Sequence, residues 1–131
     1  KPNGIFYGSG KKAGVMETEA FAYSAFKPDL ATQSGPMLLI NGALHPSISP
    51  SGSSIKIRNG VCVNDGNKVL LAISDDFVTF YQFALMFRDG LHCKNALFLD
   101  GSVSSLYAPE LKRSDYLSTI GPMLGVTSPV K

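Results

Sequence analysis

The chain has 131 residues, a length that suits one domain with a buried core, and 44% of its residues are apolar, which is ordinary for a globular protein. Its formal net charge is +2 and its basic residues form no cluster, so its charge does not indicate nucleic-acid binding. No apolar run approaches the roughly 18 residues of a membrane-spanning helix. We therefore expect a single domain over residues 1–131 that does not span a membrane.

The N-terminal residues predict a hairpin followed by a short helix. Two apolar segments, residues 5–7 and 13–16, flank Gly8-Ser9-Gly10, a pattern typical of a hairpin with a glycine-containing loop. Residues 19–26 are expected to form a short helix that ends before Pro28, because the residue preceding a proline disfavours helical geometry.

The next segment predicts a strand and a long loop. Residues 36–40 are compactly apolar and lead into the turn pair Asn41-Gly42. Residues 46–54 contain Pro, Ser and Gly with little apolar content, so we expect a loop. Its length is typical of a lid or rim rather than of a plain connector.

Alternation in residues 55–63 predicts a strand with one apolar and one polar face. The apolar face comprises Ile55, Ile57, Val61 and Val63, and the other face comprises Lys56, Arg58, Gly60 and Cys62. Residues 69–73 follow the turn at Asp65-Gly66 and are continuously apolar, which predicts a strand covered on both faces. This pairing would present Arg58 at the edge of a pocket.

The clearest helix begins at Thr79, which forms a predicted capping box with Gln82. Its apolar stripe is expected to be core and comprises Phe80, Phe83, Ala84, Phe87 and Leu91. Gly90 occupies the expected C-terminal cap, and Ser114-Asp115 predicts the start of a last short helix. These elements together predict an α+β fold, a mixed and largely antiparallel sheet with one or two packed helices.

Asp100 is the leading candidate for chemistry. The apolar strand 96–99 delivers it to a turn of small residues, 101–105, in which Gly101 lets a ligand approach closely. Hydroxyls and amides of this turn can bind an oxyanion or a sugar hydroxyl. The alternative is an ordinary Asp-Gly turn in which Asp100 caps its own loop.

Three other groups are candidates for ligand binding. Arg58 can bind a phosphate or carboxylate in a bidentate manner, or it forms a structural ion pair, for which Asp100 is a candidate partner. Residues 33–36 (Gln-Ser-Gly-Pro) offer an amide, a hydroxyl and a bend, or they form a plain loop. His45 is an acid, a base or a ligand, or a solvent-facing histidine.

The two cysteines, Cys62 and Cys93, are too few for a disulfide framework and lack the spacing of a zinc site. They are either two small buried residues or a single disulfide, which would require an oxidising compartment. With only two histidines, far apart in sequence, we expect neither a metal nor another cofactor.

Three motifs taken in order resemble the phosphodiester glycosidase domain family, closest to its bacterial branch. They are Gln33-Ser34-Gly35-Pro36-x-Leu38 with Asn41-Gly42, Arg58-Asn59-Gly60-Val61, and Asn95-Ala96-Leu97-x-Leu99-Asp100-Gly101-Ser102-x-Ser104. The family includes the lysosomal uncovering enzyme, which removes N-acetylglucosamine from a sugar-phosphate diester. Its usual N-terminal Asn-Gly-x-Phe motif has no confident match here, and the chain begins at Lys1 rather than Met. We therefore expect that this chain is the C-terminal part of the domain.

The resemblance implies a hydrolase that cleaves a sugar from a sugar-phosphate diester. In that reading Asp100 and Arg58 are catalytic, as acid/base and as the charge that neutralises the phosphate. The substrate-binding residues are Gln33, Ser34, Gly35, Asn59, Gly101, Ser102, Ser104 and His45. Ser102 stands where the family often has a second glycine, which makes an identical substrate specificity doubtful. A second catalytic carboxylate is not apparent; Glu17 is a distant candidate.

Two other functions compete with the hydrolase. One is a non-catalytic carbohydrate- or phosphate-binding module of the cell envelope. The other is a structural or partner-binding domain, for which an exposed apolar patch would be the sign. From the habit of the family we expect a periplasmic or secreted protein whose partner is a carbohydrate or sugar-phosphate ligand, not nucleic acid. A homo-oligomer is a further expectation, because an incomplete domain would expose apolar surface.

Overall fold

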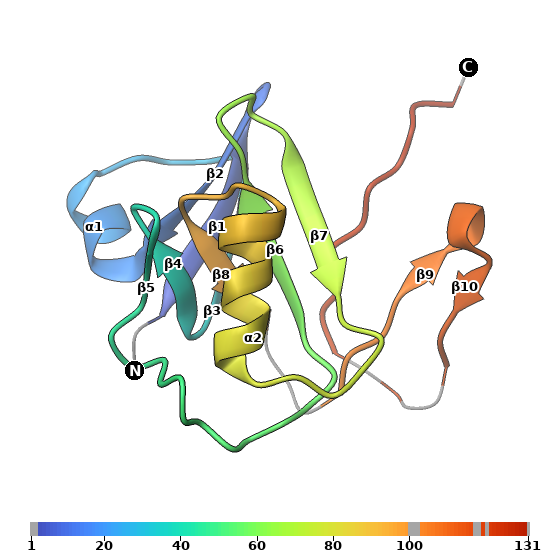
Figure 1. The fold of residues 1–131 in the computed structure, drawn as a ribbon. Coiled ribbons are helices and arrows are strands. Elements are labelled where there is room, and N and C mark those ends of the chain that lie inside the picture. The colour runs from blue at the N-terminus through green and yellow to red at the C-terminus, as the bar shows by residue number, and fades with distance from the viewer. Residues whose placement is uncertain (1–2, 100–102, 117–118, 120, 131) are drawn as a thin grey trace.

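The computed structural model describes residues 3–99, 103–116, 119 and 121–130 (Figure 1). Its elements, in chain order, are β1 (Gly4–Ser9), β2 (Lys12–Glu17), α1 (Thr18–Tyr23), β3 (Leu30–Ser34), β4 (Met37–Ile40), β5 (Ala43–Leu44), β6 (Asn59–Val63), β7 (Val69–Ile73), α2 (Phe80–Leu85), β8 (Ala96–Phe98), β9 (Tyr107–Ala108) and β10 (Arg113–Ser114). A π-helical turn, Met86–Gly90, continues α2, and a 3-10 turn, Pro109–Leu111, separates β9 from β10.

The strands of the described segments form three antiparallel sheets. One has the order β2-β1-β3, the largest has the order β5-β4-β8-β6-β7, and β9 and β10 form a two-stranded hairpin. This arrangement confirms the predicted α+β class and the predicted N-terminal hairpin. It adds β3, which was not predicted, because Gln33 and Ser34 continue a strand instead of forming a loop. No helix in the described ranges is long and apolar enough to cross a membrane.

The five-stranded sheet is the middle layer, with a separate apolar cluster on each face. On one face Phe83 and Ala84 of α2 and Phe87 of the π-helical turn pack with buried residues of β4, β6 and β8. On the other face Phe6 and Val15 of the small sheet pack against Val61 and its neighbours. Figure 1 shows α2 across the sheet, with β1 and β2 on its far side. The predicted core stripe of the helix is thus confirmed.

The helix begins as predicted and ends differently. The Thr79 hydroxyl accepts a hydrogen bond from the Gln82 amide at 3.1 Å, and the Gln82 side chain accepts one from the Thr79 amide at 3.0 Å, which completes the capping box. Gly90 does not cap the helix, because the π-helical turn runs through it. His92, with φ of 56°, adopts the left-handed conformation instead.

The strand predicted over residues 69–73 is confirmed as β7, but its predicted coverage on both faces is wrong. Residues 69–73 form an edge strand with Val69 and Leu71 exposed, because no strand of the described segments pairs with β7 on its outer side. An apolar run alone does not distinguish a buried central strand from an edge strand. The expected helix at Ser114-Asp115 is instead the end of a hairpin, in which Asp115 accepts hydrogen bonds from the Leu106 amide and from Arg113.

The two cysteines are joined in a disulfide, which decides the alternative that the sequence left open. Cys62 lies near the C-terminal end of β6, and Cys93 follows the π-helical turn. Both residues belong to the apolar cluster under α2. The bond therefore ties the C-terminal end of the helix to the strand that the helix covers.

Gly60 marks the closest approach of α2 to the sheet, and an alanine there should destabilise the protein. A Cβ atom at Gly60 would lie 2.9 Å from the Leu97 carbonyl oxygen and 3.1 Å from ring carbons of both Phe83 and Phe87. We expect Gly60→Ala to lower the free energy of unfolding by about 1–3 kcal/mol through overpacking. Urea denaturation measures the change. Gly121→Ala, where a Cβ would meet nothing within 4 Å, is the matched control.

Candidate functional site

Three segments far apart in sequence meet at one end of the five-stranded sheet. The Phe98 amide donates to the Pro36 carbonyl at 3.2 Å, and the Leu99 amide donates to the Asn59 carbonyl at 3.0 Å. The end of β8 therefore lies between the start of β4 and the start of β6. With adjacent strands about 4.8 Å apart, the segments before β4 and β6 lie roughly 10 Å from each other. All three segments carry residues predicted to form the site.

Asp100, the predicted catalytic carboxylate, lies outside the described residues, together with Gly101 and Ser102. The chain enters that segment from Leu99 and leaves it at Val103, and Leu99 is bonded to Asn59. The described neighbours of the predicted turn therefore belong to the end of the sheet where the other motifs meet.

Arg58 is buried, and the prediction that it lies on a non-core face is wrong. Arg58 is 1% exposed and is the one charged residue in the described core. The alternation in residues 55–63 misplaced it for two reasons. The strand begins only at Asn59, and its two faces are both covered, one by α2 and one by the small sheet. Ile55, predicted for the core face, is 56% exposed.

The guanidinium of Arg58 connects three elements. Its Nε donates to the Val78 carbonyl at 2.9 Å, and its Nη2 donates to the Ser54 carbonyl at 2.9 Å. Its central carbon lies 3.7 Å from the centre of the Phe80 ring, in the range of a cation–π contact. The loop 46–54 and the start of α2 are therefore both held by this one side chain.

The charge of Arg58 has no carboxylate partner within the described ranges. The ion pairs there involve Arg88, Lys94 and Arg113, and the acceptors of Arg58 are neutral carbonyl groups. Burial lowers the pKa of the Arg58 guanidinium, because desolvation disfavours the charged form, but a guanidinium stays protonated in proteins. A buried positive charge therefore lies at the end of the sheet where the motifs meet.

Asn59 and Ser104, both predicted to bind ligand, contact each other. The Asn59 side-chain amide donates to the Ser104 hydroxyl at 2.9 Å, and that hydroxyl donates its proton to the Ile57 carbonyl at 3.0 Å. The hydroxyl of Ser104 has only one proton, so it can accept but not donate a further hydrogen bond in this arrangement. The two residues thus fasten the segment after Ser102 to the start of β6.

The residues before β4 are placed at the same end of the sheet, each with its own partner. The Gln33 side chain donates to the Thr18 hydroxyl at 3.3 Å, and Ser34 pairs with Gly4 in the small sheet. Gly35 allows close contact with Asn3, since a Cβ atom there would meet the Asn3 side chain at 2.2 Å. The loop predicted here is therefore a packed junction between the two sheets.

His45 contacts its own loop rather than the other predicted residues. Its Nδ1 accepts a hydrogen bond from the Ser47 amide at 3.1 Å and lies 2.8 Å from the Ser47 hydroxyl. In the parts of the chain that the structure describes, no three His, Cys, Asp or Glu side chains are close enough to hold a metal ion. The described site residues are thus hydrogen-bonding groups and one guanidinium.

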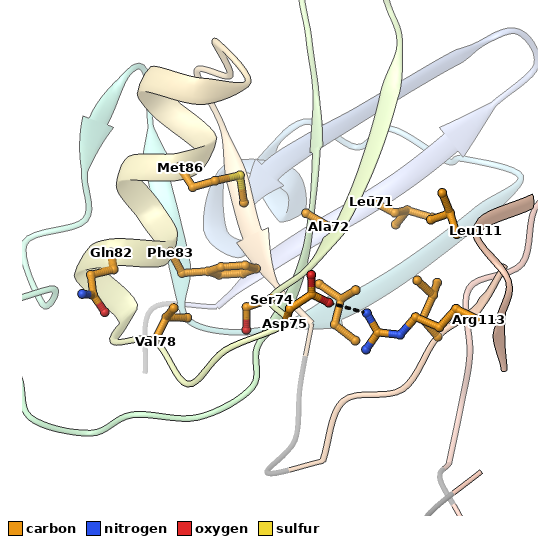
Figure 2. Close-up of a pocket in the computed structure, with 12 residues that line it drawn as sticks. Leu71, Ala72, Ser74, Asp75, Val78, Gln82, Phe83, Met86, Leu111 and Arg113 are labelled. Atoms are coloured by element: carbon orange, nitrogen blue, oxygen red, sulfur yellow. Dashed lines mark hydrogen bonds and ion pairs between the residues drawn. The ribbon is translucent and has the colours of Figure 1, made fainter. Parts of the chain in front are cut away.

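A cavity that was not predicted lies elsewhere among the described residues. It is a groove of about 610 Å³ between β7, α2 and the β9–β10 hairpin, and it contains none of the predicted site residues. Figure 2 shows Gln82, Phe83 and Met86 on one side of the groove and Leu111 and Arg113 on the other. A second, smaller cavity of about 120 Å³ is lined by Ser54 and Phe80, which contact Arg58.

Comparison with known proteins gave one family and one relative. The phosphodiester glycosidase family model matches residues 10–126. The uncharacterized protein YigE of Escherichia coli (strain K12) is 39% identical over 107 residues, which are 82% of this chain and 42% of that protein. The chain thus spans less than half the length of this relative. No solved structure matches it significantly.

The burial of Arg58 predicts that lysine cannot replace it. A lysine at residue 58 keeps the charge but lacks the planar fork that reaches both carbonyl groups while stacking on Phe80. We expect Arg58→Lys to lower the free energy of unfolding by about 1–3 kcal/mol, because a buried cation then lacks hydrogen bonds that the guanidinium makes. Arg88→Lys, at a solvent-exposed ion pair with Asp89, is the control and should leave the urea midpoint unchanged. Equal midpoints for both variants would contradict a structural role for Arg58.

Proposed function

We propose that this chain, which belongs to the phosphodiester glycosidase family, carries part of a hydrolytic site that releases a sugar from a sugar-phosphate diester. One observation supports this above all. One part of each family motif, Pro36, Asn59 and Leu99, meets at the end of the five-stranded sheet where the buried Arg58 precedes β6. Strand ends of a rigid sheet hold functional groups in fixed positions.

The reaction breaks the bond between the anomeric carbon of the sugar and the phosphate oxygen. A water molecule supplies the hydroxyl group of the free sugar, and the phosphate leaves as a monoester that keeps the bonding electron pair. Negative charge therefore develops on the phosphate in the transition state. A preorganised positive charge in a poorly solvated site stabilises such charge more than water does. This role fits Arg58, because its charge lacks a carboxylate partner in the described ranges.

In this proposal Arg58 acts mainly through its electric field, because at 1% exposure its side chain is not open to a substrate in this structure. Asn59 and Ser104 are positioning residues that fix the segment beginning after Ser102. Asp100 is the acid/base group and removes a proton from the attacking water. Ser102 and Gln33 supply hydrogen bonds to the sugar-phosphate.

The nature of the leaving group explains how the reaction can proceed with one catalytic carboxylate. Most glycosidases use a second carboxylic acid to protonate an alcohol as it leaves. A phosphate monoester needs no such help, since its second pKa is about 6, so it leaves as a stable anion at neutral pH. A carboxylate opposite a fixed cation is therefore a sufficient set for this class of substrate. Glu17 is not required.

We further propose that the protein works in the periplasm or outside the cell. The Cys62–Cys93 disulfide supports this location, because structural disulfides persist in oxidising compartments and are rare in the cytosol.

The proposal is tested with N-acetylglucosamine linked through phosphate to p-nitrophenol. We expect free N-acetylglucosamine and p-nitrophenyl phosphate in equal amounts, measured by chromatography. Asp100→Asn should reduce kcat by at least about a hundredfold, as expected for loss of an acid/base group. Asp65→Asn, which changes an exposed carboxylate beyond the end of β6 opposite to Asn59, should leave the rate unchanged.

The positioning role of Ser104 is tested by comparing two serine variants. Ser104→Ala and Ser105→Ala each remove one hydroxyl that bonds a backbone carbonyl, of Ile57 and of Asp115 respectively. We expect Ser104→Ala to lower kcat about tenfold more than Ser105→Ala, with similar losses of stability and similar KM values. Binding of the substrate without any turnover would instead indicate a carbohydrate-binding module.

A further inference from the structure

The outer edge of β7 carries backbone groups that face away from the sheet. Ser74 donates its amide to the Arg58 carbonyl, and Asn64 donates to the Lys68 carbonyl, so the even-numbered residues of β7 bond β6. In an antiparallel ladder the bonding direction alternates along the strand. The amides and carbonyls of Val69, Leu71 and Ile73 therefore point outward, and in the described ranges no partner is present for them.

This edge lacks the features that usually keep an exposed strand from pairing. Sheet edges are commonly interrupted by a proline, a bulge or a charged residue. The five residues Val69–Ile73 contain no proline and no charge, and their register with β6 is uninterrupted. Leu71 is 46% exposed and Val69 is 36% exposed. An uncharged apolar edge of this kind is either covered by a partner or prone to aggregate.

Part of this strand borders the groove described above. The groove of about 610 Å³ runs beside β7, from Leu71 to Asp75, and its two walls are α2 and the β9–β10 hairpin. Arg113 of the hairpin is bonded to Asp75 at 2.9 Å and holds the second wall in place (Figure 2).

The charges at the two ends of β7 indicate which strand fits. Lys68 precedes the strand, and Asp75 and Asp76 follow it, and all three residues are exposed. A second β7 running antiparallel brings the positive end of each copy to the negative end of the other. A parallel arrangement would bring like charges together. The edge is therefore complementary to itself in the antiparallel direction.

We propose that β7 pairs with β7 of a second copy of this chain, in antiparallel orientation, to form one continuous sheet across a two-fold dimer. Only outward-facing residues can bond each other, which restricts the register. The most complete pairing puts Leu71 opposite the partner's Leu71, with Val69 opposite the partner's Ile73. The backbone groups of all three outward-facing residues of each strand are then hydrogen-bonded to the other copy. Lys68 lies diagonal to the partner's Asp76, within reach of a lysine side chain.

The test measures the mass of the full chain by sedimentation velocity over roughly 1–100 μM. We expect a dimer of twice the chain mass. Leu71→Lys places two positive charges face to face at the two-fold axis and should raise the dimer dissociation constant at least about tenfold. Leu30→Lys is the control, because Leu30 is a leucine of similar exposure, 53%, in the edge strand β3 of the small sheet.

A charge exchange tests the register without touching the apolar residues. Lys68→Glu and Asp76→Lys should each weaken the dimer, by roughly three- to tenfold, and the double variant should restore it. Circular dichroism confirms that each variant is folded. A wild-type chain that stays monomeric throughout the range overturns the proposal. So does a dimer that Leu30→Lys weakens as much as Leu71→Lys, or one that the charge variants leave unchanged.

Discussion

The buried guanidinium of Arg58 is the interaction on which the arrangement of this molecule depends. It holds the long loop through Ser54, the segment before α2 through Val78, and the first ring of the helix through Phe80. Desolvating a charge is costly, so the structure must provide hydrogen bonds and an aromatic face in compensation. That requirement fixes how the loop, the helix and β6 meet. The junction of these three segments therefore rests on one residue.

Local patterns in the sequence predicted the elements whose geometry is set by neighbouring residues. The capping box at Thr79 and the stripe through Phe83 and Phe87 correctly gave the helix and its buried face. Predictions failed where a third layer decides burial. Residue alternation places Arg58 opposite the core only if one face of its strand is open, and here both faces are covered. Likewise, residues 69–73 look like a central strand, although β7 lies at an edge.

Each motif contains one residue, Pro36, Asn59 or Leu99, that lies at the same end of the five-stranded sheet. Their order in sequence did not reveal that β8 would lie between β4 and β6, which is what brings Pro36 and Asn59 close to the same strand. The groove beside β7 could not be predicted, since one of its walls is the irregular β9–β10 hairpin, positioned by the Arg113–Asp75 ion pair. Such a contact depends on tertiary placement and leaves no periodic signal in the sequence.

The Cys62–Cys93 disulfide encloses both β7 and α2 within one covalent ring. Two exposed places in the chain, the turn at Asp65-Gly66 and the residue Phe77, lie inside that ring. A single cleavage there leaves two polypeptides that remain chemically joined, with the helix and its strand still held together at Cys62 and Cys93. A protease cut between Cys62 and Cys93 can thus give a nicked molecule that does not come apart.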